Sequence, residues 1–368
     1  MALTPIISTA PQRLLLEPDA WERVLVVAPH PDDESLATAN LLDRARAHGA
    51  AVRVVFCTDG ESNPWPQRAL ERRWTIDAAA RRRWAARRRD EARAALECLG
   101  LPPRCALFLH APDQGLTRVL LAGGQEFLAR LTVALETWRP TMVAAPSLRD
   151  RHPDHSAAGV LVRLAVSRLP AAARWFTELA YVVHGPTPAP PALSLPLTSA
   201  GLARKRAAIL CHATQLALSR RRMLSHAVHT ERFLAPGTAR VRHPVRCVAM
   251  DDDALVVGLD GEGLLGGRLY VVGQTAAGRV VVRSSTVRPR QRDARFRVPA
   301  PLVRVFVKRE TSRLFFDGSG WRELWLPRAG TPTDDGRRRA PAGVAAPYEI
   351  SPSRISPPPR PGTRAAPR

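Results

Sequence analysis

Two short clusters of histidine and aspartate are the residues of this chain best suited to chemistry. The segment His30–Asp33, with the sequence HPDD, follows the apolar run Val24–Ala28, and the segment Arg151–His155, with the sequence RHPDH, follows the apolar run Thr141–Ala145. Imidazole nitrogens and carboxylate oxygens are ligands that suit zinc. In open α/β sheets, ligands bind in the crevice at the carboxyl ends of the strands. The sequence therefore predicts that the two clusters meet around one metal ion.

The expected ligands are His30, Asp33 and His155, because two imidazoles and one carboxylate leave a coordination position open for water. Zinc bound in this way lowers the pKa of its water to about 7 and polarises a carbonyl, so hydrolysis of an amide becomes feasible at neutral pH. Asp32 is the expected general base, which takes the proton and returns it to the leaving amine. The sequence leaves open whether the native metal is zinc or ferrous iron.

The second cluster predicts two further roles. His152 lies three residues before His155, so both rings can face one crevice, and an imidazolium at position 152 would stabilise the oxyanion of a tetrahedral intermediate. Asp154 can hold a ring in the required tautomer. A single His-Pro-Asp triplet is more often a turn with a capping aspartate, but two such triplets between apolar runs and helix-like segments favour a metal site. Surface or structural roles are expected for His48, His226, His229 and His243.

Apolar runs alternate with helix-like segments over the first two thirds of the chain. This pattern predicts a Rossmann-like α/β fold, with a mostly parallel sheet flanked by crossover helices. The expected strands are Val24–Ala28, Val52–Cys57, Cys105–Leu109, Thr141–Ala145 and Glu178–Val183. The expected helices are Ser35–His48, Thr75–Leu99, Gln125–Trp138, Ala157–Arg168 and Leu202–Leu218.

The last third of the chain has a different pattern, in which short β-branched runs predict a small antiparallel β-rich module. The expected runs are Val245–Met250, Ala254–Leu259, Leu269–Val272, Val280–Val282 and Val303–Lys308, and its expected core aromatics are Phe315, Phe316, Trp321 and Trp325. Residues 327–368 are rich in Pro and Arg, so we expect a disordered tail. The predicted organisation is an extension over residues 1–20, a catalytic domain over 21–235, the module over 236–326 and the tail.

The composition limits the classes of partner. The chain of 368 residues has a formal charge of +22, but only Lys205 and Lys308 are lysines, so the excess of arginine is read as compositional bias on a solvated surface. Nucleic acid is therefore not an expected partner, while anionic substrates or peripheral contact with an anionic membrane stay as the alternative. Five scattered cysteines and the lack of a signal or spanning segment predict a cytoplasmic protein. The oligomeric state is left open.

The two clusters resemble the motifs of the PIG-L-like (LmbE-like) de-N-acetylases. Ala28–Glu34 is similar to the first motif of that family, whose usual form is Ala-His-Pro-Asp-Asp-Glu, although here a proline directly precedes the histidine. His152–His155 is similar to the second motif. The resemblance, which covers about residues 22–220, implies the same roles as the residue types do: His30, Asp33 and His155 as zinc ligands, Asp32 as base and His152 as oxyanion stabiliser.

Weaker resemblances lie between and after these motifs. Thr58–Glu61 and Pro112–Leu116 resemble loops that border the substrate in the family. Arg88 with Glu91 resembles its Arg-x-x-Glu helix, and Lys205–Gln215 resembles its Lys…His-x-Ser-Gln helix, with threonine in place of serine. The resemblance implies substrate contacts for Glu61, Arg88 and Asp113. On residue type alone, Arg88 would be one basic residue on a solvated helix face.

The predicted function is that of a zinc-dependent hydrolase that removes an acetyl group from an N-acetylated amino sugar or sugar conjugate. Its expected partner is a small-molecule N-acetyl amino-sugar conjugate. One alternative is a zinc amidase that acts on a different amide, such as a thiol conjugate, since surrounding loops select the rest of the substrate. The other alternative is a catalytically silent metal-bearing protein that binds an anionic partner.

Overall fold

The computed structural model of the protein describes residues 21–174, 176–186, 191–235, 243–251, 253–259, 267–299, 301–310 and 320–326. The predicted extension over residues 1–20 and the predicted disordered tail over residues 327–368 lie outside this set. None of the helices described is both long and apolar enough to cross a bilayer.

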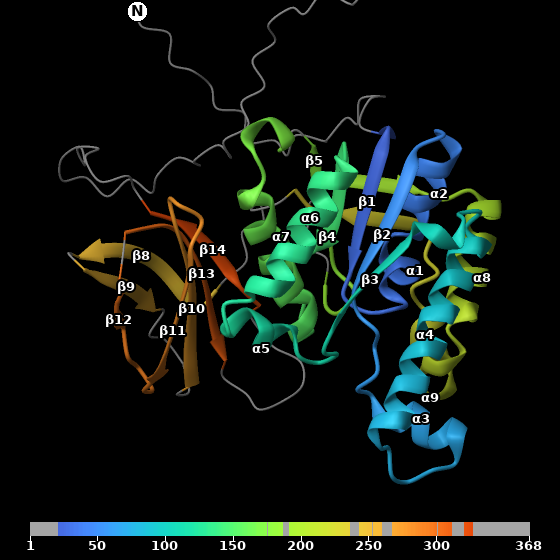
Figure 1. The fold of residues 1–368 in the computed structure, drawn as a ribbon, viewed down its shortest axis with the longest axis horizontal. Coiled ribbons are helices and arrows are strands. Elements are labelled where there is room, and N and C mark those ends of the chain that lie inside the picture. The colour runs from blue at the N-terminus through green and yellow to red at the C-terminus, as the bar shows by residue number, and fades with distance from the viewer. Residues whose placement is uncertain are drawn as a thin grey trace, which may run out of the picture. The chain divides into compact units, whose positions relative to one another are not determined.

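A parallel sheet with the strand order β3-β2-β1-β4-β5 forms the centre of the N-terminal region (Figure 1). Its strands are β1 Arg23–Ala28, β2 Ala51–Thr58, β3 Ala106–Ala111, β4 Met142–Pro146 and β5 Thr177–Tyr181. The chain moves outward from β1 through β2 to β3 and then returns to β4 on the other side of β1. The order of strands therefore reverses between β1 and β4, and their carboxyl ends form the crevice in which such sheets bind ligands.

Helices cover both faces of this sheet (Figure 1). They are α1 Asp33–Ala37, α2 Ala39–Ala47, α3 Pro64–Glu71, α4 Ala78–Cys98, α5 Leu116–Leu121, α6 Gln125–Trp138, α7 Pro153–Arg168, α8 Ser199–Cys211 and α9 Ala213–Leu224. Val24 and Val26 of β1 pack in the core with α2, α4 and α8, whereas Leu25 and Val27 pack in the core with α6 and α7. Because both faces are buried, β1 is a continuous apolar run rather than an alternating one. A short antiparallel pair, β6 Leu193–Pro196 and β7 Thr230–Phe233, lies beside this layer.

The C-terminal region forms two antiparallel sheets, with the strand orders β11-β10-β13-β14 and β12-β9-β8. Its strands are β8 Val245–Asp251, β9 Ala254–Leu259, β10 Gly267–Thr275, β11 Val280–Val287, β12 Asp293–Arg297, β13 Leu302–Glu310 and β14 Arg322–Trp325. Val272, Phe306 and Trp321 of this region join the core formed by α6 and α7. The Arg304 guanidinium donates a hydrogen bond to the carbonyl of Arg163 on α7 at 3.1 Å.

The predicted fold class is confirmed: a parallel sheet flanked by helices precedes an antiparallel β region. The predicted boundary near residue 235 stays a prediction. Trp321 is fully buried, as expected of a core aromatic. The core position predicted for Trp325 is wrong, since this side chain is 51% exposed on the edge strand β14. Phe315 and Phe316 lie outside the described residues.

Two predicted helices are each broken by a polar side chain. The helix expected over Ser35–His48 is divided into α1 and α2 at Thr38, whose hydroxyl donates to the carbonyl of Glu34 at 2.9 Å. The helix expected over Leu202–Leu218 is divided into α8 and α9 at His212, whose ring contacts the Glu34 carboxylate. Both divisions therefore occur at a residue that contacts Glu34, next to the turn after β1.

Candidate active site

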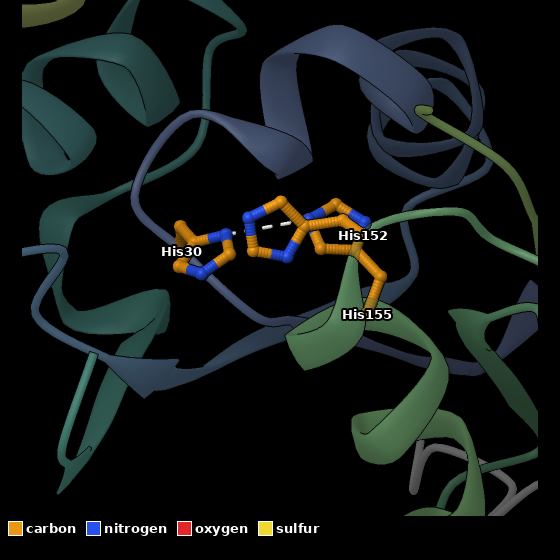
Figure 2. Close-up of side chains that lie close together, drawn as sticks. All are labelled: His30, His152 and His155. Carbon is orange, nitrogen blue, oxygen red and sulfur yellow. Dashed lines mark hydrogen bonds between the residues drawn. The ribbon is translucent and has the colours of Figure 1, made fainter. Parts of the chain in front are cut away.

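The loops after β1 and β4 bring the two predicted clusters together. His30 lies two residues beyond β1, and His152 and His155 lie at the start of α7. Figure 2 shows the three imidazoles grouped in one space, with the rings of His30 and His155 in contact. All three side chains are buried. The two segments, which are more than a hundred residues apart in the sequence, therefore meet where the strand order reverses, as predicted.

Three donor atoms are spaced as tetrahedral zinc would require. Nδ1 of His30 lies 3.3 Å from Oδ2 of Asp33 and 3.3 Å from Nε2 of His155, and the latter two atoms are 3.2 Å apart. Ligands at about 2.0–2.1 Å from a tetrahedral zinc ion are separated by about 3.3–3.4 Å. The triangle formed by these atoms therefore fits one face of a tetrahedron.

Other side chains widen the set of groups that could hold a metal ion. His30, His152 and His155 form one such group among the described residues; a second joins Asp33, His155 and His184, and a third joins His30, Asp113 and Asp154. Each group contains His30 or His155. The overlapping sets thus point to one locus for a cation.

The charge balance of the cluster also suits a cation. Burial would raise the pKa of Asp33, but the charge and hydrogen bond of His155 hold it well below its ordinary value. Burial would lower the pKa of His155, but Asp33 and Asp150 raise it to about 9. Hydrogen bonds that the His30 ring donates to the carboxylates of Asp113, Asp154 and Asp33 likewise overcome burial and raise the pKa of His30 well above its usual range. The carboxylates therefore attract positive charge to the imidazoles, and a metal cation would replace their protons.

The turn after β1 is held in an unusual backbone conformation. Asp32 has a φ of 146°, a backbone angle that residues other than glycine rarely adopt. The backbone N–H of Asp32 donates to the Glu34 carboxylate at 2.9 Å, and the N–H of His30 donates to Asp33 Oδ2 at 2.9 Å. Backbone strain of this kind persists only where surrounding bonds fix it, and it clusters at functional sites.

Arg88 fixes the carboxylate of Asp32. Its Nη2 lies 3.1 Å from Asp32 Oδ2 and 2.6 Å from the carbonyl of Pro31, and its Nη1 donates to the carbonyl of Gly60 at 2.7 Å. A Cβ at Gly60 would overlap the guanidinium, and the positive φ of 69° also favours glycine at that position. Burial raises the pKa of Asp32 to about 6, although the charge of Arg88 opposes this shift. A carboxylate with this pKa is suited to general base catalysis near neutral pH.

Asp150 is a residue of the site that the sequence reasoning missed. Its Oδ2 lies 3.2 Å from Nδ1 of His155 and accepts hydrogen bonds from the backbone of Val183 at 2.7 Å and of His184 at 3.1 Å. Its Oδ1 accepts from the N–H of His152 at 2.9 Å. A carboxylate on the outer nitrogen of a ligating histidine fixes its tautomer and orientation. Its position two residues before the second motif was the only signal in the sequence.

His152 lies in the predicted cluster, but its surroundings favour a different charge from the one expected. Burial and the neighbouring imidazoles of His30, His155 and His184 hold its pKa well below the usual value, which favours the neutral ring over an imidazolium. Its Nδ1 accepts a hydrogen bond from the N–H of Asp154 at 3.2 Å, which leaves the proton on Nε2. The ring can therefore act as a neutral hydrogen-bond donor.

Asp154 and Asp113 both face the outer nitrogen of His30. Nε2 of His30 lies 3.3 Å from Asp113 Oδ1 and 3.5 Å from Asp154 Oδ2. Asp154 thus orients His30 rather than His152. Glu61 lies one step further away, where its Oε1 accepts from the N–H of Asp113 at 3.1 Å. Arg88 lies on the opposite side, behind Asp32, with both terminal nitrogens bonded to the protein.

Lys205 on α8 and His212 at the junction of α8 and α9 lie in different environments. His212 Nε2 lies 3.0 Å from Glu34 Oε1, next to the site turn. Lys205 is buried away from the cluster and pairs with Glu231 at 2.7 Å. His212 therefore supports the turn after β1, and Lys205 is structural.

The sequence is also similar to proteins of known name. Residues 25–166, which contain both motifs, match the family model "PIG-L: GlcNAc-PI de-N-acetylase". The chain is 33% identical over 146 residues to a 1D-myo-inositol 2-acetamido-2-deoxy-alpha-D-glucopyranoside deacetylase of Mycobacterium avium, covering 36% of this chain and 47% of the relative. A protein of the same name from Actinosynnema mirum is 34% identical over 158 residues, covering 39% of this chain and 55% of the relative. The chain spans about half the length of the curated relatives it matches.

Among solved structures, the chain is similar to the N,N'-diacetylchitobiose deacetylase of Pyrococcus horikoshii. The sequence identity is 22% and the TM-score 0.45, with 58% of this chain and 82% of that chain covered. The family match spans the strands, loops and helix that build the cluster, from β1 to α7. Residues 25–166 therefore match a domain of the PIG-L family.

Proposed function

We propose that this protein is a zinc-dependent N-deacetylase that removes an acetyl group from an N-acetylated amino sugar or a sugar conjugate. The observation that carries the proposal is the triangle of His30 Nδ1, Asp33 Oδ2 and His155 Nε2, with sides of 3.2–3.3 Å, beside the buried carboxylate of Asp32. The PIG-L domain supports the same reaction, and so do relatives named as deacetylases of a 2-acetamido sugar.

The donor set fits zinc, with His30, Asp33 and His155 as its ligands. When bound there, zinc would polarise the acetyl carbonyl and lower the pKa of a water molecule to about 7. Two imidazoles and one carboxylate also suit ferrous iron, which is the alternative native metal. Asp150 holds His155 from its outer side, and Asp113 and Asp154 hold His30 in the same way.

The chain's own groups supply the proton transfers. Asp32 accepts a proton from the attacking water and delivers it to the nitrogen of the leaving amine. Arg88 is a positioning residue, because it binds Oδ2 of Asp32 and the backbone carbonyls of Pro31 and Gly60. His152 presents its Nε2 proton to the oxygen of the tetrahedral intermediate, where a preorganised donor lowers the barrier.

The substrate enters, in this proposal, past the loops that follow β2 and β3. Glu61 and Asp113 lie on these loops, and their carboxylates can accept hydrogen bonds from sugar hydroxyl groups. Burial raises the pKa of Glu61, whereas the hydrogen bond from His30 overcomes burial and lowers the pKa of Asp113. A cytoplasmic location is part of the same proposal, and the scattered positions of the five cysteines in the sequence support it.

The test combines metal content with product identity. The protein is purified without added zinc, its metals are measured by mass spectrometry, and acetate release is assayed across a panel of N-acetylglucosamine conjugates. We expect one zinc or iron per chain and acetate release that a chelator abolishes and zinc restores. Amine release from larger acyl donors without acetate release would instead indicate an amidase of different specificity. Full metal occupancy without any hydrolysis would favour a silent metal protein.

A further inference from the structure

Large apolar side chains are exposed together at one end of the helical layer. Trp74 is 76% exposed, Trp65 59%, Leu218 58% and Leu70 42%. They belong to α3, to the loop behind it and to α9, and α3 packs against α9 (Figure 1). We call these four side chains the α3–α9 tip. Elsewhere in the described residues, large apolar side chains are exposed only singly, at Val133, Val228 and Trp325.

The exposed aromatic pair is held in place. The Arg68 guanidinium lies 5.0 Å from the ring centre of Trp65 and 4.8 Å from that of Trp74. Its Nε also donates a hydrogen bond to the carbonyl of Trp74 at 2.8 Å. The two indoles are 6.5 Å apart in an edge-on arrangement. The tip is thus an ordered apolar surface, and such patches on soluble domains mark interaction sites.

Cationic side chains surround the tip. Arginines that are exposed next to it lie after α3 and at the end of α9: Arg72, Arg73, Arg220, Arg221 and Arg222. Glu71 is half-buried, and Arg83 lies 3.5 Å from its carboxylate. Helices that lie at the boundary between lipid headgroups and acyl chains combine tryptophan and leucine with arginine. The cationic side chains of such helices bind anionic headgroups.

A single-stranded nucleic acid fits this surface less well. Bases stack on free aromatic faces, whereas Arg68 already lies between the two indoles. The aliphatic side chains of Leu70 and Leu218 offer no face for stacking, but they suit insertion among acyl chains. The observations therefore favour a bilayer as the occupant.

We propose that the α3–α9 tip docks the protein onto anionic lipid bilayers. Trp65, Leu70, Trp74 and Leu218 insert at the headgroup boundary, and the surrounding arginines bind lipid phosphates. α3 begins at Pro64, directly after the loop that contains Glu61, so a docked tip connects the lipid surface with one wall of the candidate site. This surface extends the proposed function without being required for hydrolysis of a water-soluble substrate.

The experiment is cosedimentation of the full chain with vesicles of phosphatidylcholine alone and of equal parts phosphatidylcholine and phosphatidylglycerol. We expect binding to the anionic vesicles only, weakened by salt. The double variant Trp65→Ser/Trp74→Ser should bind them at least about tenfold more weakly. The matched control is Trp325→Ser, which removes an indole of similar exposure from β14 and should bind as the parent does. The unfolding midpoint and hydrolysis of a soluble substrate verify that both variants are folded.

Several results would overturn the proposal. Parent-level vesicle binding by the double variant would exclude the tip as the docking surface. Equal binding to neutral and anionic vesicles would exclude the proposed recognition of anionic lipid. Lack of vesicle binding, together with tip-dependent binding of single-stranded oligonucleotides, would identify the tip as a nucleic-acid surface. Lack of vesicle binding, together with tip-dependent dimerisation, would identify the tip as an interface between copies of this chain.

Discussion

Replacement of Asp150 by asparagine tests how the metal ligands are oriented. The Asp150 carboxylate contacts Nδ1 of His155 at 3.2 Å, and neither side chain is exposed. If the asparagine oxygen faces His155, its amide group faces the N–H of His152 and the hydrogen bond there is lost. In the flipped orientation the amide donates to His155 Nδ1 and drives the ring proton onto Nε2. That atom belongs to the proposed ligand triangle, so either orientation weakens metal binding.

The expected size of the effect follows from these contacts. Loss of a carboxylate behind a ligating histidine typically weakens metal affinity by about 10–100-fold, which is about 1.4–2.8 kcal/mol. We expect the upper half of this range, because Asp150 is buried and also organises the backbone of His152, Val183 and His184. Zinc affinity is measured by competition with a chromophoric chelator, on protein whose unfolding midpoint is recorded in parallel.

The matched control is Asp43→Asn, which removes a carboxylate that Arg204 binds at 2.7 Å on the surface of α2. This variant should keep the zinc affinity of the parent protein. The reasoning is refuted if Asp150→Asn retains zinc affinity within about twofold of the parent while His155→Ala loses zinc.

Three further predictions concern separate parts of the chain. Asp32→Asn should retain zinc but lower the rate of acetate release by about 10²–10⁴-fold, because it removes the general base; metal content and turnover are measured on one preparation. The Sγ atoms of Cys98 and Cys211 lie 3.4 Å apart, so a disulfide oxidant such as oxidised glutathione should cross-link them. Mass spectra of the alkylated protein should then show two fewer reactive thiols per chain. Burial lowers the pKa of His243 to about 3, so the fold favours the neutral ring. The neutral ring contributes its full share to the free energy of unfolding above the unfolded-state pKa near 6.5, and this contribution falls as the pH decreases toward 3. Urea unfolding should show a loss of about 2 kcal/mol between pH 7 and pH 5, and His243→Gln should flatten this slope.

Each of these predictions has a clear contrary result. Unchanged turnover in Asp32→Asn would remove the proposed base from the mechanism. Persistent reaction of both thiols with alkylating reagent after oxidation would mean that Cys98 and Cys211 do not reach each other. An equal pH slope in the parent and in His243→Gln would assign the acid sensitivity to other groups.

The fold was predictable where one strand or helix carried its own signal. β1 and β4 are continuous apolar runs buried on both faces, and each precedes a His-Pro-Asp motif. The position of the motifs at the strand-order reversal then followed from the rules for parallel sheets. The proposed ligand triangle needed no information beyond those two strands and the loops after them.

The remaining features depend on contacts between distant segments. The break at His212 depends on Glu34, which lies far earlier in the sequence. The low pKa of His152 arises from burial and from the neighbouring rings of His30 and His184, which only the folded chain brings near. Arg88 was expected at the substrate, but its contacts with the turn at Asp32 became visible only in three dimensions.

The central claim is that His30, Asp33 and His155 bind one metal ion. X-ray absorption spectroscopy of the zinc-loaded protein tests it most directly. The account predicts one zinc per chain with nitrogen and oxygen ligands at about 2.0–2.1 Å and the scattering pattern of two imidazoles, lost in His155→Ala. A sulfur shell at about 2.3 Å, or a spectrum that His155→Ala leaves unchanged, would contradict it.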